Sequence, residues 1–184
     1  MKLIFILILT YTFVSSNNIS ANENIENCSI KNVPSKERIF SKNFSGVFNG
    51  KRIDYVASLK EKIIYEKDNP SEPMASFFYT EYIVESDKNR PIIFSFNGGP
   101  GSASLWLHMG VLGPKVIKVP SDASDDGSAP FKIVDNNLSP LSDADLVFID
   151  PIGTGYSRAI GCHEPEEFWG VSEDPKIIAE FIRR

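Results

Sequence analysis

The 184 residues are 42% hydrophobic and 23% charged, a composition that suits one globular unit. The formal net charge of −5 leaves no electrostatic case for nucleic acid as a partner. The two cysteines, Cys28 and Cys162, permit one disulfide within an exported chain, but the sequence does not show that they meet.

Residues 1–21 have the pattern of a secretory signal peptide. Lys2 supplies a positive charge, residues 3–14 form an apolar core of the expected length, and Ala21 offers a small residue for cleavage. The apolar run is too short for a comfortable transmembrane helix, so a membrane anchor is the weaker alternative. We therefore predict a secreted or periplasmic protein that has no membrane association after signal cleavage.

Residues 22–45 are polar and irregular, and we predict that they form a flexible lead-in to a domain spanning residues 46–184. Residues 47–65 alternate around Asn49-Gly50, which is a strong signal for a β-hairpin with a type I′ turn. Aromatic and β-branched residues at 76–85 predict another strand. These strands give an antiparallel start to a sheet.

A short apolar run at residues 92–96 is bounded by breakers and predicts a buried strand, which we place in the same antiparallel start. The run leads into Asn97-Gly98-Gly99-Pro100-Gly101, and residues 102–109 follow as a short helix ended by Gly110 or by Gly113-Pro114. Glycines let the backbone approach a bound group closely, and exposed N–H groups at a helix start can hold an anion or a developing oxyanion.

The glycine-rich turn is neither a P-loop nor a dinucleotide fingerprint, because the required lysine and the third glycine are missing. The residues alone leave open a tight structural turn or an anion-binding loop. Asn97 favours the second, since its side-chain amide can donate to a carboxylate. No cofactor is predicted.

The acidic stretch 121–130 lacks the glycine and the distal glutamate of an EF-hand loop, so we predict a solvated surface loop there and no metal site. Residues 146–149 predict a second buried strand, which ends at Asp150-Pro151 and leads into a tight turn. The side chains of Asp150, Tyr156 and Ser157 could line a pocket or brace that turn, and the sequence favours neither.

Residues 173–184 predict an amphipathic helix that packs on the sheet. His108 lies in an apolar run and is predicted to be a packed, hydrogen-bonded ring rather than a catalytic base. His163 stands beside Cys162 and Glu164 in what we predict to be a surface loop. It has no orienting third group for nucleophilic catalysis and no standard spacing for a metal site.

Two of these segments, in this order, resemble the serine carboxypeptidase family, which consists of α/β-hydrolases that remove C-terminal residues from peptides. The segments are the glycine-rich loop at residues 97–104 and the strand and Gly-Thr-Gly turn at residues 145–157. The resemblance begins near Gly46, runs to the end of the chain and has the character of the bacterial branch. It implies an α/β fold with an antiparallel start followed by parallel strands, and a peptide with a free C-terminus as the partner.

The resemblance also implies roles for individual residues. Asn97 would bind the substrate's C-terminal carboxylate through its amide, with the Gly98 N–H helping, and the Gly99 N–H would supply half of the oxyanion hole. Ser102 stands where eukaryotic members have a cysteine, so their disulfide framework does not carry over. Residues 109–113 lack the glutamate that some members use for the carboxylate.

The nucleophile of an α/β-hydrolase lies in a Gly-x-Ser-x-Gly elbow, and the acid and the histidine follow it. Neither glycine-rich segment fits this pattern: in residues 153–157 the serine follows the second glycine, and in residues 101–104 no glycine closes the motif. In the resembled family the elbow comes after the helix predicted at 173–184. We therefore expect this chain to be an N-terminal fragment that is inactive by itself.

Two alternatives stay open. Another α/β-hydrolase, such as a proline iminopeptidase, would need histidine where this chain has Asn97. A catalytically inactive peptide-binding protein that ends at Arg184 would leave an apolar sheet edge exposed. Downstream sequence would separate the first alternative from a carboxypeptidase, and the solubility of the bare chain would test the second.

Overall fold

The structure is a computed structural model that describes residues 33–86, 89–98, 101–119, 129–170 and 173–183. The predicted signal peptide, Cys28, Gly99 and most of the acidic loop lie outside these ranges. The structure therefore does not test the predictions for the signal peptide, for Gly99 or for the acidic loop.

Five strands form the body of one mixed sheet. In spatial order they are β1 (Ile39–Phe48), β2 (Lys51–Tyr65), β3 (Pro73–Ile83), β7 (Asp145–Ile149) and β4 (Ile92–Ser95). Strands β1, β2, β3 and β7 pair with one another in antiparallel fashion, whereas β4 is parallel to β7. The short strand β8 (Arg158–Ala159) also pairs with β3. The mixed sheet confirms the predicted α/β class, but β4 belongs to its parallel part and not to the antiparallel start.

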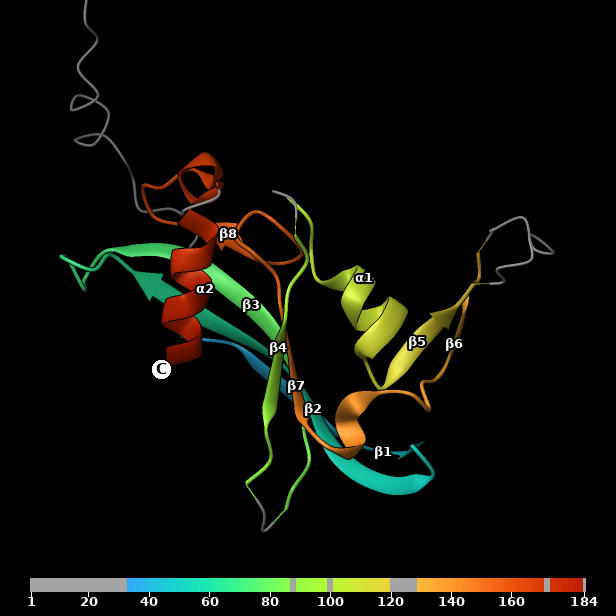
Figure 1. Cartoon of the computed structure of the whole chain (residues 1–184). Coiled ribbons are helices and arrows are strands. Elements are labelled where there is room, and N and C mark those ends of the chain that lie inside the picture. The colour runs from blue at the N-terminus through green and yellow to red at the C-terminus, as the bar shows by residue number, and fades with distance from the viewer. Residues whose placement is uncertain (1–32, 87–88, 99–100, 120–128, 171–172, 184) are drawn as a thin grey trace, which may run out of the picture.

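The remaining elements are a ribbon and helices. The ribbon pairs β5 (Lys115–Lys118) with β6 (Lys132–Asp135), and the helices are α1 (Leu105–Leu107), the π-helix His108–Leu112, the 3₁₀-helices Pro140–Ser142 and Pro165–Phe168, and α2 (Glu173–Arg183). In Figure 1, α2 lies on one face of the sheet, and α1 with the β5–β6 ribbon lies on the other.

The hairpin between β1 and β2 forms where the sequence predicts it. Asn49 and Gly50 both have positive φ, at 49° and 75°, as a type I′ turn requires. Strand β1, however, begins at Ile39 and so occupies part of the stretch predicted as a flexible lead-in. Because its residues are almost all exposed, the sequence of β1 shows no pattern of a buried face. The strand forms because it pairs with β2.

Strand β7 is fully buried and supplies side chains to two cores, because successive residues of a strand point to opposite faces. Val147 and Ile149 belong to the core under α2, and Leu146 and Phe148 belong to the core under α1. Full burial of a side chain such as Phe148 contributes about 1.5–3 kcal/mol to folding. The prediction of a buried strand at residues 146–149 is therefore confirmed.

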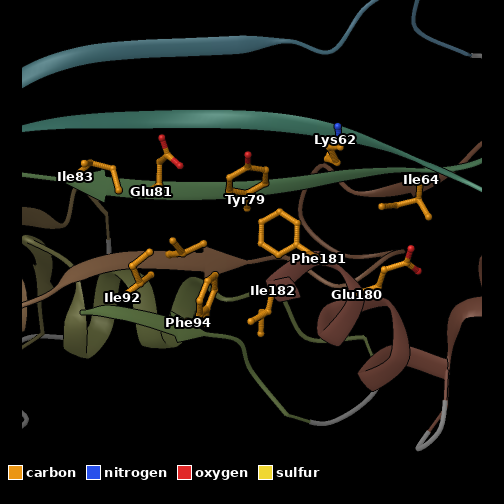
Figure 2. Close-up of a pocket in the computed structure, with 11 residues that line it drawn as sticks. Lys62, Ile64, Tyr79, Glu81, Ile83, Ile92, Phe94, Glu180, Phe181 and Ile182 are labelled. Atoms are coloured by element: carbon orange, nitrogen blue, oxygen red, sulfur yellow. The ribbon is translucent and has the colours of Figure 1, made fainter. Parts of the chain in front are cut away.

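The predicted C-terminal helix is α2, and it packs on the sheet through Phe181. The Phe181 ring lies 5.2 Å from Phe77, 4.7 Å from Tyr79 and 6.4 Å from Phe94, measured between ring centroids. Beside these rings a groove of about 470 Å³ remains between the helix and the sheet, as Figure 2 shows. The prediction that β4 is buried is wrong for the described residues, because Ile92 at its start is 50% exposed in this groove.

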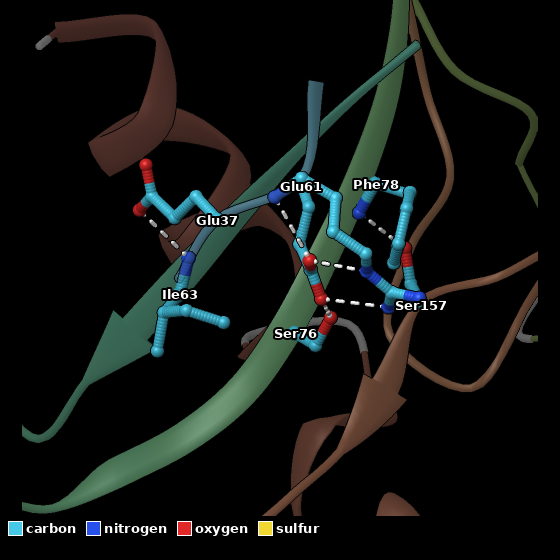
Figure 3. Close-up of polar contacts among 7 residues, drawn as sticks. Glu37, Glu61, Ile63, Ser76, Phe78 and Ser157 are labelled. Carbon is cyan, nitrogen blue, oxygen red and sulfur yellow. Dashed lines mark hydrogen bonds and ion pairs between the residues drawn. The ribbon is translucent and has the colours of Figure 1, made fainter. Parts of the chain in front are cut away.

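An ion pair between the half-exposed Arg38 and the buried Glu61 ties the segment before β1 to the sheet. The side chain of Glu61 on β2 is fully buried, and it accepts hydrogen bonds from Arg38 Nε at 2.7 Å and Nη2 at 3.0 Å (Figure 3). Ser76 on β3 donates its hydroxyl to the same carboxylate. The hydrogen bonds from Arg38 hold the pKa of Glu61 below its usual range.

Candidate functional site

The two segments singled out in the sequence meet at one edge of the sheet. Because β4 and β7 are parallel, their carboxyl ends lie at the same edge, where open α/β sheets place ligands. Asn97 follows the end of β4, and Asp150 follows the end of β7 directly. The glycine-rich loop and the Gly-Thr-Gly turn are therefore neighbours in space.

Asn97 keeps part of its hydrogen-bonding capacity unused. Its Nδ2 donates to Ser102 Oγ at 3.2 Å, whereas its Oδ1 is buried without a partner among the described residues. An amide nitrogen carries two N–H groups, so Nδ2 can donate a second hydrogen bond. A buried polar atom left unpaired costs about 1–3 kcal/mol, and such an atom in a native structure calls for an explanation.

The backbone beside Asn97 lies open. A Cβ placed on Gly98 would meet nothing within 4 Å among the described residues. Packing therefore gives no reason for a glycine at this position, and close approach of a ligand to the backbone does. Gly99, the predicted oxyanion-hole residue, lies outside the described part of the chain.

The helix after the loop differs from its prediction at residues 102–109. It begins at Leu105 as a short α-helix and continues through Gly110 as a π-helix to Leu112. It ends at Gly113, whose N–H donates to the carbonyl of His108 at 2.9 Å and whose backbone is extended. The start is delayed because Ser104 is held by a contact from another segment.

That contact is the main feature that sequence reasoning missed. Asp150 Oδ1 accepts hydrogen bonds from both the N–H and the hydroxyl of Ser104, each at 2.8 Å. The residues are 46 positions apart, so no local pattern announces the contact. The alternation of β7 does indicate the face: Asp150 continues the row of Leu146 and Phe148, which faces α1.

The structure answers the open question about the side chains after β7. Ser157 braces the turn: its fully buried hydroxyl accepts from the N–H of Phe78 at 2.8 Å and donates to the carbonyl of Asp150 at 2.7 Å. Figure 3 shows the contact with Phe78. Tyr156 is 70% exposed and lies against the Phe78 ring, 5.8 Å away.

His108 is a packed ring, as predicted. Its Nε2 lies 2.5 Å from the hydroxyl of Tyr82, and its ring stacks on Phe148 with 4.4 Å between centroids. Burial lowers the pKa of His108 to about 4, a shift that the nearby Asp150 charge only partly opposes. The ring is therefore neutral near pH 7 and forms part of the floor beneath the loop.

The second histidine is also accounted for. His163 Nδ1 lies 2.7 Å from Glu167 Oε2, and Cys162 is in a disulfide, so no Cys–His nucleophile pair exists there. Cys28, the other cysteine of the sequence, lies outside the described residues. Within the described ranges no cluster of three or more metal-ligating side chains occurs, and no helix is long and apolar enough to span a membrane.

Comparison with known proteins decides the family. A family model described as serine carboxypeptidase matches residues 56–165, a range that contains both the glycine-rich loop and the Gly-Thr-Gly turn. The chain belongs to the serine carboxypeptidase family. This confirms the resemblance stated from the two motifs.

Curated proteins with serine carboxypeptidase names are also similar to this chain. Serine carboxypeptidase-like 9 of Arabidopsis thaliana is 32% identical over 117 residues, which are 61% of this chain and 25% of that protein. Carboxypeptidase Y homolog A of Chaetomium globosum is 33% identical over 104 residues, 55% of this chain and 17% of that protein. The chain thus spans a quarter or less of the length of these relatives.

Proposed function

We propose that the complete protein is an exported serine carboxypeptidase that hydrolyses the last peptide bond of peptides with a free C-terminus. The family membership supports the reaction class. The observation that carries the proposal is the Asn97 Nδ2 group, which donates one of its two N–H groups to Ser102, beside the open backbone of Gly98 at the carboxyl edge of two parallel strands. The apolar N-terminal segment with Lys2 supports export.

In this proposal Asn97 and Gly98 recognise the carboxylate of the substrate's last residue. The second N–H of Asn97 Nδ2 and the N–H of Gly98 donate to the two oxygens. A hydrogen bond to a charged group contributes about 1.5–3 kcal/mol, which is enough to distinguish a free acid from its amide. Ser102 keeps the Asn97 amide in place through the 3.2 Å hydrogen bond.

The Gly99 N–H supplies one of the two oxyanion-hole donors, since it follows the carboxylate-binding residues in the same loop. Loss of one such donor lowers the rate by about 10²–10³. No Gly-x-Ser-x-Gly elbow occurs within the 184 residues, so the serine, the acid and the histidine of the triad are assigned to parts of the protein that this chain does not contain.

The test uses the complete protein and two N-blocked dipeptide substrates that differ only at the C-terminus, one a free acid and the other its amide. Asn97→Ala is expected to lower kcat/KM for the acid by about 10–100-fold, the loss of one charge-assisted hydrogen bond. The isosteric Asn97→Asp is expected to lower it further, because a carboxylate placed there repels the substrate's carboxylate. Both variants should change the rate on the amide much less.

Asn43→Ala serves as the matched control, because this asparagine is exposed on β1 and is remote from the loop. Equal losses on acid and amide in the Asn97 variants would contradict the carboxylate role. Release of N-terminal proline instead of C-terminal residues would favour the iminopeptidase alternative.

A further inference from the structure

We infer that Asp150 is a positioning residue, which fixes the substrate loop through Ser104, and that the Gly-Thr-Gly turn serves to hold its carboxylate in place. The inference rests on the proposed function, because it assigns a catalytic consequence to the placement of residues 97–104. In this inference, the second of the two segments that carry the family resemblance holds the first in position.

Ser104 is held by two hydrogen bonds to a single oxygen. Its N–H and its hydroxyl both reach Asp150 Oδ1 at 2.8 Å, and Ser104 is 4% exposed. Hydrogen bonds to a carboxylate are about twice as strong as those between neutral groups. A buried serine with both donors on one carboxylate oxygen has little freedom to move.

The hydroxyl of Ser104 makes this contact instead of capping the helix that follows it. Ser104 stands at the N-cap of α1, where a serine hydroxyl usually accepts from a backbone N–H of the first turn. Here no such side-chain cap bond forms. The hydroxyl is directed to Asp150, so the contact is not a by-product of ordinary helix capping.

The turn after β7 is shaped around the Asp150 carboxylate. A Cβ on Gly155, which has φ of 51°, would lie 2.1 Å from Asp150 Oδ2. From the other side the Ser157 hydroxyl donates to the Asp150 carbonyl and accepts from Phe78 on β3. A continuous path therefore runs from the central sheet through Ser157 and Asp150 to Ser104.

The consequence for the loop follows from its two ends. Asn97 follows β4 closely in the chain, and Ser104 is fixed by Asp150, so Asn97 and Gly98 belong to a loop that is held at both ends. Misplacing a catalytic group by about 1 Å can cost about 10²-fold in rate. Asp150 thus governs transition-state stabilisation without touching the substrate.

Asp150→Asn and Ser104→Ala, made in the complete protein, test the inference. Asp150→Asn keeps the shape but removes the charge, and we expect kcat on the free-acid dipeptide to fall about 10–100-fold, with a smaller acid-to-amide preference. Ser104→Ala removes only one hydrogen bond and should cost about 3–10-fold. The double variant should be no worse than Asp150→Asn, since both changes break one contact.

Ser58→Ala is the matched control. It removes the hydrogen bond between the buried Ser58 on β2 and Ser41 on β1, at 2.9 Å, and lies outside both glycine-rich turns. We expect it to lower the melting temperature and to keep kcat. Rates are normalised to the enzyme labelled by a fluorophosphonate, so that loss of folded protein is not counted as loss of rate.

Hydrogen exchange supplies a second measurement that does not depend on activity. Amides of residues 101–107 should exchange at least about 10-fold faster in Asp150→Asn, whereas amides of the β1–β2 hairpin should be unchanged. An active wild type whose Asp150→Asn variant keeps kcat, acid preference and loop protection would overturn the positioning role. A wild type without carboxypeptidase activity would overturn the proposed function, and the exchange rates would still decide whether Asp150 holds the loop.

Discussion

Two glycine-rich turns lie at the carboxyl edge of the parallel strands, at residues 97–104 and 150–157. They differ in how fully their polar side chains are hydrogen-bonded within the protein. In the second turn, the hydroxyls of Thr154 and Ser157 donate hydrogen bonds to backbone carbonyls. The Arg158 guanidinium donates to two further carbonyls of the turn. In the first, Asn97 Oδ1 stays unpaired among the described residues and nothing covers Gly98.

The glycines differ in the same way. Gly153 and Gly155 lie where a Cβ would come within 2.6 Å of the Trp169 side chain and 2.1 Å of Asp150, so packing inside the protein explains them. A Cβ on Gly98 would meet no atom of the described residues within 4 Å. Where a side chain would collide with the protein, packing explains the glycine and the turn has a structural role. Where a side chain would meet nothing, we expect the glycine to leave room for a ligand.

The largest effect expected from this comparison is that of Gly155→Ala. The added Cβ collides with the Asp150 carboxylate at a positive φ, and we expect a loss of about 2–4 kcal/mol in the free energy of unfolding. Urea denaturation of the complete protein measures it. A loss below about 0.5 kcal/mol would mean that the second turn is not closed around Asp150.

The next effect concerns the floor beneath the open loop and depends on pH. The folded pKa of His108 is about 4, against about 6.5 for an unperturbed histidine, so below pH 6.5 the unfolded state binds more protons. The free energy of unfolding should therefore fall by up to about 3 kcal/mol as the pH drops from about 6.5 to about 4. Above pH 6.5 this contribution of the neutral His108 is fully present.

His108→Gln tests this slope, because glutamine can keep a hydrogen bond to Tyr82 but does not titrate. Its unfolding free energy, measured at pH 7 and pH 5, should differ less between the two pH values than that of the wild type. His163→Gln controls for the loss of a histidine as such. An unchanged slope in His108→Gln would show that this ring does not titrate as described.

The smallest effect on stability is expected for Gly98→Ala. The methyl group meets no described atom, so the free energy of unfolding should change by less than about 1 kcal/mol. Hydrolysis of the free-acid dipeptide should nevertheless fall about 10-fold or more, because the methyl group occupies the approach to the loop. Full activity of Gly98→Ala would contradict a ligand at this position.

Turn residues and apolar patterns in the sequence predicted those elements that depend mainly on neighbouring residues. Asn49-Gly50 fixed the hairpin, the apolar run before Asp150 marked β7, and the apolar face of residues 177–182 marked α2. Strand β1 escaped prediction because an exposed edge strand carries no buried face, and its partner determines it.

The candidate site divides in the same way. The glycine-rich loop could be found because glycine and asparagine carry their conformational and hydrogen-bonding properties in the sequence itself. The Asn97 amide was predicted from its chemistry to donate to a carboxylate, and only the family resemblance implied that this is the C-terminal carboxylate of a substrate. The contact of Asp150 with Ser104 spans 46 positions and depends on the parallel pairing of β4 with β7, which no local pattern specifies.

The ion pair between Arg38 and Glu61 sets a limit on how far the protein can be trimmed from its N-terminus. A protein that starts at Gly46 would retain the buried Glu61 carboxylate with its Arg38 partner gone, whereas cleavage of the proposed signal peptide near Ala21 would leave Arg38 in place. A buried carboxylate that loses its charged partner is destabilising. The polar stretch before the hairpin is therefore part of the smallest unit that can be expected to fold, and a protease that cut between Arg38 and Phe48 would loosen the sheet from its edge inward.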